Sequence, residues 1–374
     1  MFRKTIFFSI LICCLCSCEF FSPKVQNETT LQKACNFLWS KQFEDGAWHS
    51  ETHGIMKGGE SLTAFILWTL LEIPDSSYRK PKKKVQKGLN FIRNHINSKG
   101  VLGLSDEYIM DYPNYSTSYA LRILSKYGSK KDELLIEKMK SYLLAQQFTE
   151  QRGIQASHLA FGAWGFGEEL QKGMTGHVDL SHTRRVLQAL KIAKTNSDST
   201  FLKAKKFLSL LQKQPSENQF GATFFDGGFY ASSVTLGTNK GAILNDGEAK
   251  YYASYATATC DGLLALLASG YSIDDEPVQA AYDWLIKHPK LNFPQGMDEN
   301  DSGQWHLVLI FYHLAARAEA YNTINNKGNW RNEIEKIISK KQELDGSFSN
   351  PNGAPNKEDD PLLATALAII ALSN

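Results

Sequence analysis

The stretch that decides the fold is Leu31–Trp48, which reads LQKACNFLWSKQFEDGAW. It begins with apolar residues at helical spacing and polar residues between them, the pattern of an amphipathic helix. The pattern stops at Gly46, where glycine can take left-handed backbone angles without a steric penalty. Trp48 follows and is placed to fold back on the helix end. We therefore predict Gln42, Gly46 and Trp48 as the structural residues of a helix-ending motif.

The same motif returns near the other end of the chain. Residues 337–348 read IISKKQELDGSF, with Gln342, Gly346 and Phe348 in the corresponding places. A pattern shared by the first and last elements indicates an internal repeat. We expect each glutamine to bridge its helix end to neighbouring backbone.

Between these motifs the chain alternates two kinds of apolar segment. A helix with one apolar stripe lies at the surface, whereas a helix apolar on most sides is buried. The amphipathic segments are Leu31–Gln42, Val85–Ile96, Leu134–Gln147, Phe201–Gln212, Val278–Lys287 and Ile334–Gln342. The apolar segments are Ser61–Leu71, Ser116–Leu124, Leu180–Ile192, Ala256–Leu267, Gln304–Ala318 and Leu362–Leu372. With no long period-two alternation, the sequence predicts an all-α fold, an (α/α)6 toroid of six outer and six inner helices.

These motifs carry a resemblance to a known family. Gln, Gly and an aromatic after an apolar helix resemble the QW repeat of squalene and oxidosqualene cyclases, whose helical architecture protein prenyltransferase β subunits share. Three later stretches are similar to the bacterial prenyltransferase and squalene oxidase repeat proteins, related to the C-terminal half of squalene (hopene) cyclases: Asp179–Thr183, Ser254–Leu263 and Leu363–Leu372. The resemblance covers most of residues 30–374 and implies a toroid. It fixes no activity, because one fold hosts many functions.

The N-terminus has the pattern of an export signal. Arg3 and Lys4 precede an apolar segment, Ile6–Cys14, that is too short to span a bilayer. Leu15–Cys18 resembles a bacterial lipobox, with cleavage before Cys18 and a lipid on its sulfur; the alternative is an ordinary signal peptide with incidental cysteines. We predict a signal peptide at 1–18, a tether at 19–29 and one toroid at 30–374. The chain is then exported and anchored to a membrane of the cell envelope.

Composition narrows the partners. Hydrophobic residues make up 43% and charged residues 21%, as in an ordinary globular protein, and 41 Lys+Arg against 39 Asp+Glu leave a net charge of +2. This balance argues against a nucleic-acid partner held through its phosphates. Four of the six cysteines lie in residues 1–18, so Cys35 and Cys260 alone remain and no disulfide framework is predicted.

Two links between paired helices, Phe148–Val178 and Lys213–Ser254, are long enough to indicate function. In a toroid every link from an outer to an inner helix lies at one end. We call this end, where the inner helices begin, the mouth. Helix N-termini gathered there present unpaired N–H groups and positive dipole ends, which favour an anion or a carboxylate.

The densest polar cluster is His177-Val-Asp179-Leu-Ser-His182, at the start of the third inner helix. A carboxylate beside an imidazole holds its tautomer and raises its basicity, as acid–base chemistry requires. Asp179 and His182 are therefore catalytic candidates; the alternative is a helix cap beside a histidine bonded to a loop. The Asp-x-x-His-Thr pattern is similar to the zinc-histidine motif of prenyltransferase β subunits, but their other zinc ligands have no counterpart here. We predict no metal and no cofactor.

The two long links are rich in aromatic residues. Their rings suit an apolar or isoprenoid ligand, through burial and cation–π attraction, or plain packing of a loop on the toroid. In the fifth inner helix, His306 is a third catalytic candidate and His313 is placed to reach the centre; both can instead be core histidines. The ligand-binding candidates are His177, Trp164, Phe166, Phe229, Tyr230, Tyr255 and His313.

Two hypotheses on function remain. Cyclases of this family protonate their substrate from an Asp-x-Asp-Asp motif and join two α-barrel domains. We find no Asp-x-Asp-Asp motif in this sequence and expect one α-barrel domain. Standard squalene cyclisation is therefore not expected. The favoured hypothesis is a non-catalytic lipoprotein that binds an apolar or extended ligand, or a partner protein, at the mouth. The alternative is an enzyme that acts on an isoprenoid or a glycan through Asp179 and His182.

Overall fold

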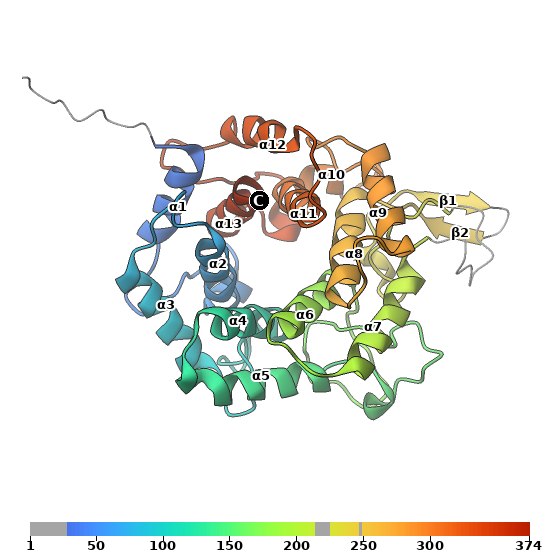
Figure 1. The fold of residues 1–374 in the computed structure, drawn as a ribbon, viewed down its shortest axis with the longest axis horizontal. Helices are drawn as coiled ribbons and strands as arrows, with labels where there is room; N and C mark the ends of the chain where they lie inside the picture. Colours follow the sequence, from blue (N-terminus) through green and yellow to red (C-terminus); the bar gives the residue numbers. More distant parts are fainter. Residues whose placement is uncertain (1–27, 214–224, 247–248) are drawn as a thin grey trace, which may run out of the picture.

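A computed structural model describes residues 28–213, 225–246 and 249–374. Its helices form two concentric rings (Figure 1), which confirms the predicted toroid. The outer ring consists of α1 (Thr30–Ser40), α3 (Lys82–His95), α5 (Glu133–Ala145), α7 (Asp198–Leu211), α9 (Glu276–Lys287) and α12 (Trp330–Ser339). The inner ring consists of α2 (Glu60–Glu72), α4 (Pro113–Tyr127), α6 (Leu180–Ile192), α8 (Ala256–Ala268), α11 (Ile310–Thr323) and α13 (Pro361–Ser373).

Burial explains why the two rings differ in sequence. Every residue of α8 is buried, because its neighbours cover it on all sides. In α12 only Trp330, Ile334 and Ile338 are buried, a single stripe at four-residue spacing. Each inner helix packs on the next, and the last one, α13, packs on the first, α2. The inner ring is therefore closed.

Each of five outer-to-inner links is fixed to its inner helix through one threonine. Each of these links contains a glycine with positive φ, which we call the link glycine. The residue two positions after it donates its backbone N–H to a buried threonine hydroxyl of the inner helix at 2.9–3.1 Å. These pairs are Trp48–Thr63, Leu102–Thr117, Trp164–Thr183, Phe229–Thr259 and Phe348–Thr365. The sixth inner helix, α11, has His313 at the corresponding turn.

In the described part of the chain the glutamine motif occurs four times rather than twice. Gln42, Gln147, Gln212 and Gln342 each donate through Nε2 to the carbonyl oxygen of their link glycine and to a carbonyl of the next outer segment. The glycines have φ of +95° at Gly46, +90° at Gly162, +80° at Gly227 and +90° at Gly346. In the last repeat the second acceptor is Thr30, so this bond ties the end of the ring to its beginning.

Two predicted features differ in the structure. The segment 304–318 was expected to be one helix, but it is interrupted at Leu309 (φ −106°, ψ +35°) between α10 (Trp305–Val308) and α11. The carboxylate of Glu358 accepts the N–H groups of Phe311 and Tyr312 there, so it replaces the helical acceptors. The second long link also contains an antiparallel hairpin, β1 (Ile243–Asp246) with β2 (Ala249–Tyr252).

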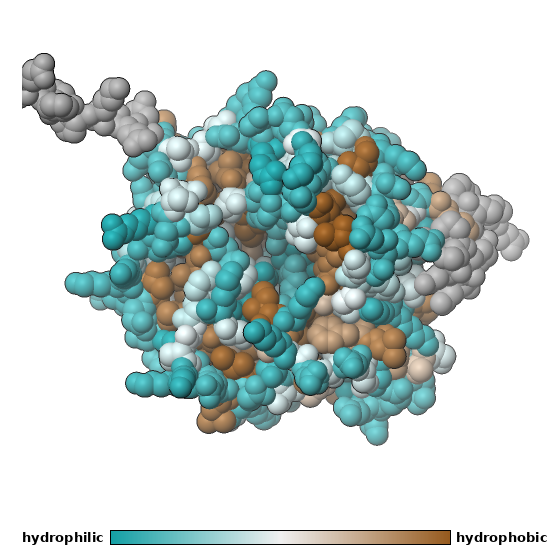
Figure 2. All heavy atoms as spheres, in the orientation of Figure 1, coloured by the Kyte–Doolittle hydropathy of each residue, from teal (hydrophilic) through white to brown (hydrophobic). Residues whose placement is uncertain are grey.

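The face seen in Figure 1 is mostly hydrophilic, with apolar residues in scattered patches (Figure 2). Among the described residues, none of the helices combines the length and the apolar character that crossing a bilayer requires.

Candidate functional site

A cavity of about 400 Å³ opens among the N-terminal ends of the inner helices. All six inner helices or their preceding links contribute side chains to its wall. The apolar part of the wall includes Leu62, Phe65, Leu309, Leu363 and Leu367. The polar part includes His177, Asp179, His182, Lys240, Asp261 and Lys357. The cavity lies at the mouth that the sequence indicated.

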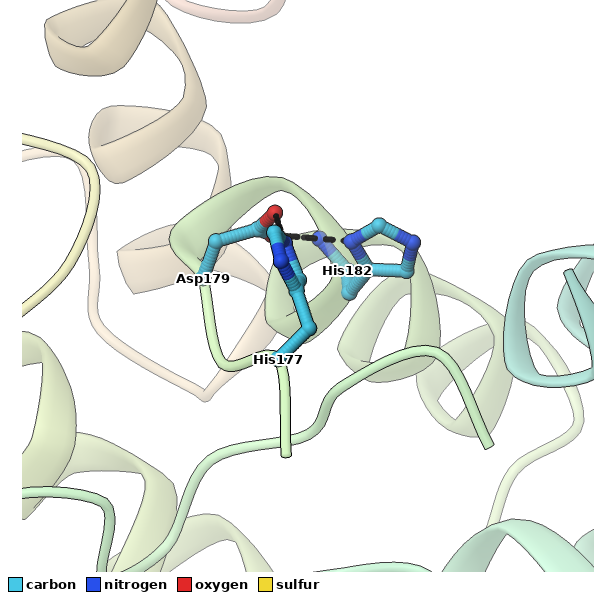
Figure 3. Close-up of side chains that lie close together, drawn as sticks. All are labelled: His177, Asp179 and His182. Atoms are coloured by element: carbon cyan, nitrogen blue, oxygen red, sulfur yellow. Dashed lines mark hydrogen bonds and ion pairs between the residues drawn. The ribbon is translucent and has the colours of Figure 1, made fainter. Parts of the chain in front are cut away.

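Asp179 is the N-cap of α6 and the centre of the polar cluster. Its Oδ1 accepts the backbone N–H of His182 at 2.8 Å and lies 2.9 Å from Nδ1 of the same ring. Its Oδ2 lies 2.6 Å from Nε2 of His177. Burial opposes ionisation, but His182 and His177 outweigh it and hold the pKa of Asp179 well below its usual 3.8. Figure 3 shows both imidazole rings directed at this carboxylate.

His182 presents its other nitrogen to the cavity. The residue is only 7% exposed to solvent, and its Nε2 has no hydrogen-bond partner among the described residues. Because Nδ1 faces an ionised carboxylate, it carries a proton, which leaves Nε2 as the ring atom that meets a bound molecule. This atom accepts a hydrogen bond when the ring is neutral and donates one when the ring is protonated.

Aromatic rings hold the two histidines in place. Phe166 stacks on His177 with ring centroids 4.0 Å apart and lies edge-on to His182 at 4.8 Å. The Tyr115 ring also lies edge-on to His182, with ring centroids 5.6 Å apart. Tyr255, the residue before α8, also lines the cavity. The predicted residues His177, Phe166, Asp179, His182 and Tyr255 therefore come together.

The other predicted residues do not line the cavity. Trp164 and Phe229 are fully buried as the aromatic residues of their repeats, and the Tyr230 hydroxyl donates to the carbonyl oxygen of Leu210 at 2.9 Å. His306 lies beside Phe293, with ring centroids 5.4 Å apart. His313 is fully buried beside the carbonyl of Lys290, and burial lowers its pKa to about 3. Its ring faces the link that contains Lys290 rather than the central cavity. It occupies the place in α11 that a threonine bonded to the preceding link occupies in the other inner helices.

One part of the site was missed from the sequence. Asp261 of α8 lines the cavity, accepts from the Tyr312 hydroxyl at 2.8 Å and pairs with Arg184 of α6 at 2.5 Å. Arg184 also pairs with Glu319 of α11, which lies 3.4 Å from Arg185. Buried charges are stable only when they are paired in this way. No local pattern indicated this network, because its members come from three different helices.

His177, Asp179 and His182 are also the kinds of side chain that bind a metal ion, and their ligand atoms lie within 4.8 Å of one another. Both histidines already hydrogen-bond the carboxylate, at 2.6 and 2.9 Å. A metal at this point would have to replace those two bonds. The geometry is that of a hydrogen-bonded triad.

The sequence matches no protein-family model. A segment of 115 residues is 27% identical to lanosterol synthase of Saccharomyces cerevisiae and covers 28% of this chain but 16% of that enzyme. Lanosterol synthase of Candida albicans is 25% identical over 124 residues, which cover 30% of this chain and 17% of the enzyme. The homology is weak and local.

Solved structures give a likeness over nearly the whole chain. The type II terpene cyclase MstE from Scytonema, in complex with merosterolic acid A, has a TM-score of 0.55 and 15% identity, over 92% of this chain and 95% of that chain. The fold is a terpenoid-cyclase-like toroid. The α-1,6-mannanase from Salegentibacter is also similar, with a TM-score of 0.53 and 10% identity over 92% and 97% of the two chains. Identities this low show the fold alone.

Proposed function

We propose that this toroid binds an elongated ligand at the mouth, with its apolar part against the aliphatic and aromatic wall and a polar group at His182. The observation that carries this proposal is the unpartnered Nε2 of His182 in an otherwise largely apolar cavity. A buried polar atom without a partner is costly, and a bound ligand would supply the missing hydrogen bond. Prenylated compounds have this shape, and MstE was solved with one, geranylgeranyl dihydroxybenzoate.

The acids of the cavity favour an apolar ligand over a glycan. Glycoside hydrolysis generally needs one carboxylic acid to protonate the leaving group and a second carboxylate to act on the sugar. Among the residues that the structure describes, the carboxylates that line the cavity are Asp179, held by two histidines, and Asp261, held by Arg184 and Tyr312. Neither is left to act as a carboxylic acid.

A second candidate function is catalysis on such a ligand. Asp179 fixes the proton of His182 on Nδ1, which leaves Nε2 as a general base directed at the cavity. Asp179 is the positioning residue and His182 the residue that would touch the substrate. This arrangement supports proton abstraction or transfer, not the carboxylic-acid protonation that starts squalene cyclisation.

We also propose that the chain is exported and held at a membrane through a lipid on Cys18. This rests on the sequence Leu15–Cys18, which lies outside the described residues. A lipid anchor would bring the mouth near a source of apolar ligands.

The binding proposal can be tested with a neutral probe. Purified protein is titrated with a fluorescent polyene alcohol, which hexadecanol then displaces. His182→Phe keeps an aromatic ring but removes Nε2, and we expect it to weaken binding about tenfold, the scale of one lost hydrogen bond. His158→Phe, at an exposed histidine of the first long link, is the control. Full-affinity binding by His182→Phe, or no binding by the wild type, would contradict the proposal.

A further inference from the structure

Helix α8 begins at the cavity without a cap. Its N-cap residue, Tyr255, makes no side-chain bond to the first turn. The N–H groups of Thr257 and Ala258 have no acceptor in the part of the chain that the structure describes, and both residues line the cavity. By contrast, Asp179 caps α6 and Asp360 caps α13. The α8 terminus therefore presents two free donors and a positive dipole end to whatever occupies the cavity.

Two lysines extend this positive region. Lys240 precedes the hairpin, and its backbone lies near the phenol of Tyr255, at the start of α8. Its Nζ lies 3.5 Å from the centroid of the Trp305 ring and donates to the Gly237 carbonyl at 2.8 Å. Lys357 lines the same cavity, with Nζ 5.4 Å from the centroid of the Tyr112 ring. Among described residues, neither ammonium is in an ion pair, and burial lowers the pKa of Lys240 to about 8.

An independent observation at the same cavity also points to a ligand. Nε2 of His182 is buried and unpartnered, and its helix, α6, packs directly on α8. Of the two acids of the wall, Asp261 is neutralised by Arg184, whereas Asp179 is hydrogen-bonded by two histidines. Among the described residues, the two lysines outnumber the one wall carboxylate, Asp179, that no lysine or arginine neutralises, so the charge left at the wall is positive.

We infer that the polar end of the ligand is an anion, a carboxylate or phosphate on a long apolar chain, held by the α8 N-terminus, by Lys240 and by the Nε2–H of a protonated His182 ring. Helix N-termini and ammonium groups bind both kinds of anion. The apolar chain would lie along Leu62, Phe65 and Leu363. This inference rests on the proposed binding function and names the class of ligand.

The test compares ligands that share one chain and differ in head group. Palmitate, hexadecyl phosphate and hexadecanol each displace the fluorescent polyene alcohol from wild-type protein at constant ionic strength. We expect at least one anion to bind about tenfold more tightly than the alcohol, as for a charge-assisted contact at a helix terminus. The tighter of the two anions identifies the head group.

Variants separate charge from fold. Lys240→Met keeps the length and apolar stem of the side chain, and we expect it to abolish the anion preference, measured as the ratio of the anion and hexadecanol affinities of the same variant. Lys340→Met, at an exposed lysine after α12, is the control and keeps the preference. Equal binding of alcohol and anions by the wild type would overturn the inference and leave the binding proposal standing. Failure of all three ligands to displace the probe would overturn both.

Discussion

Nδ1 of His182 lies 2.9 Å from Oδ1 of Asp179, and the same oxygen accepts the backbone N–H of His182 at 2.8 Å. One carboxylate oxygen thus caps the first turn of α6 and orients the ring that faces the cavity. The start of the helix and the chemistry of the site depend on a single side chain. A substitution there changes both, and pH distinguishes the two effects.

For Asp179→Asn we expect weaker ligand binding and a free energy of unfolding lower by about 1–3 kcal/mol near neutral pH, from the altered cap and the lost charge. The pKa of Asp179 is depressed in the folded chain. Its stabilisation is therefore present above its usual pKa of 3.8 and is lost as pH falls through the lower folded value.

Urea unfolding between pH 7 and acid conditions, on wild type and Asp179→Asn, checks this expectation. The difference between the two proteins should narrow once the pH is below about 4. A difference independent of pH would show that the charge of Asp179 contributes nothing to stability, so that Asp179 is only a cap. Unchanged ligand binding by the variant would remove it from the site.

The repeat glycines give a prediction with a matched control. Gly346 has φ +90°, and a Cβ there would lie 2.6 Å from the carbonyl oxygen of Lys33 in α1. Gly270 has φ +98°, but a Cβ there meets nothing within 4 Å. We expect Gly346→Ala to lower the free energy of unfolding by about 3 kcal/mol, from both strain and contact. Gly270→Ala should cost about 1 kcal/mol, from the backbone angle alone.

Chemical denaturation of both variants measures the two costs. The difference between them reports how tightly the last link packs on the first outer helix, where the ring closes. An equal loss of unfolding free energy in the two variants would mean that the backbone around Lys33 moves aside without a penalty. The contact between Gly346 and Lys33 would then not stabilise the closed ring.

The rings of helices could be predicted because burial leaves a pattern in local sequence. Ile334 and Ile338 of α12 show the stripe of an outer helix, and uninterrupted apolar residues mark α8 as an inner helix. The two compact motifs were found for the same reason: Gln42 and Gly46 are four residues apart.

The remaining repeats could not be found from spacing. Gln147 binds the carbonyl of Gly162, fifteen residues later, and Gln212 binds that of Gly227 at the same separation. The insertion between glutamine and glycine moves them apart in sequence while their geometry is kept. Trp164 and Phe229 were therefore assigned to ligand binding, although they are the buried aromatic residues of these repeats.

The site was predicted only where its residues are neighbours in the sequence. Asp179 and His182 occupy one helical turn, so their spacing was enough to bring them together. Arg184 and Asp261 are 77 positions apart, and only the packing of α6 on α8 pairs them. Tertiary contacts of this kind leave no periodic signal in one sequence.

The anchoring proposal predicts that Cys18→Ala releases the protein from membranes, because the lipid on its sulfur would supply the apolar attachment. Cys16→Ala, two positions earlier in the same segment, is the matched control and should stay in the membrane fraction. Fractionation of cells followed by immunoblotting compares the two variants with wild type. A soluble wild type, or a membrane-bound Cys18→Ala, would show that Leu15–Cys18 is not a lipid attachment site.

Glu358 predicts a second pH dependence, of opposite sign to that of Asp179. Its carboxylate is buried where α10 and α11 meet and accepts from Phe311 and Tyr312, yet burial raises its pKa to about 7. The folded chain therefore binds this proton more tightly than the unfolded chain, where the pKa is near its usual 4.5. The free energy of unfolding should fall as pH rises from about 4.5 through 7, by about 3 kcal/mol.

Glu358→Gln removes the titration while keeping the size of the side chain and one acceptor oxygen. We expect the variant to lack this fall, so that wild type is favoured over the variant most at the acid end of the window. Urea unfolding of both proteins at several pH values measures the two slopes, and their difference isolates Glu358 from other groups. Identical slopes would show that Glu358 is already ionised in the folded chain throughout this range, because the N–H groups of Phe311 and Tyr312 compensate fully for its burial.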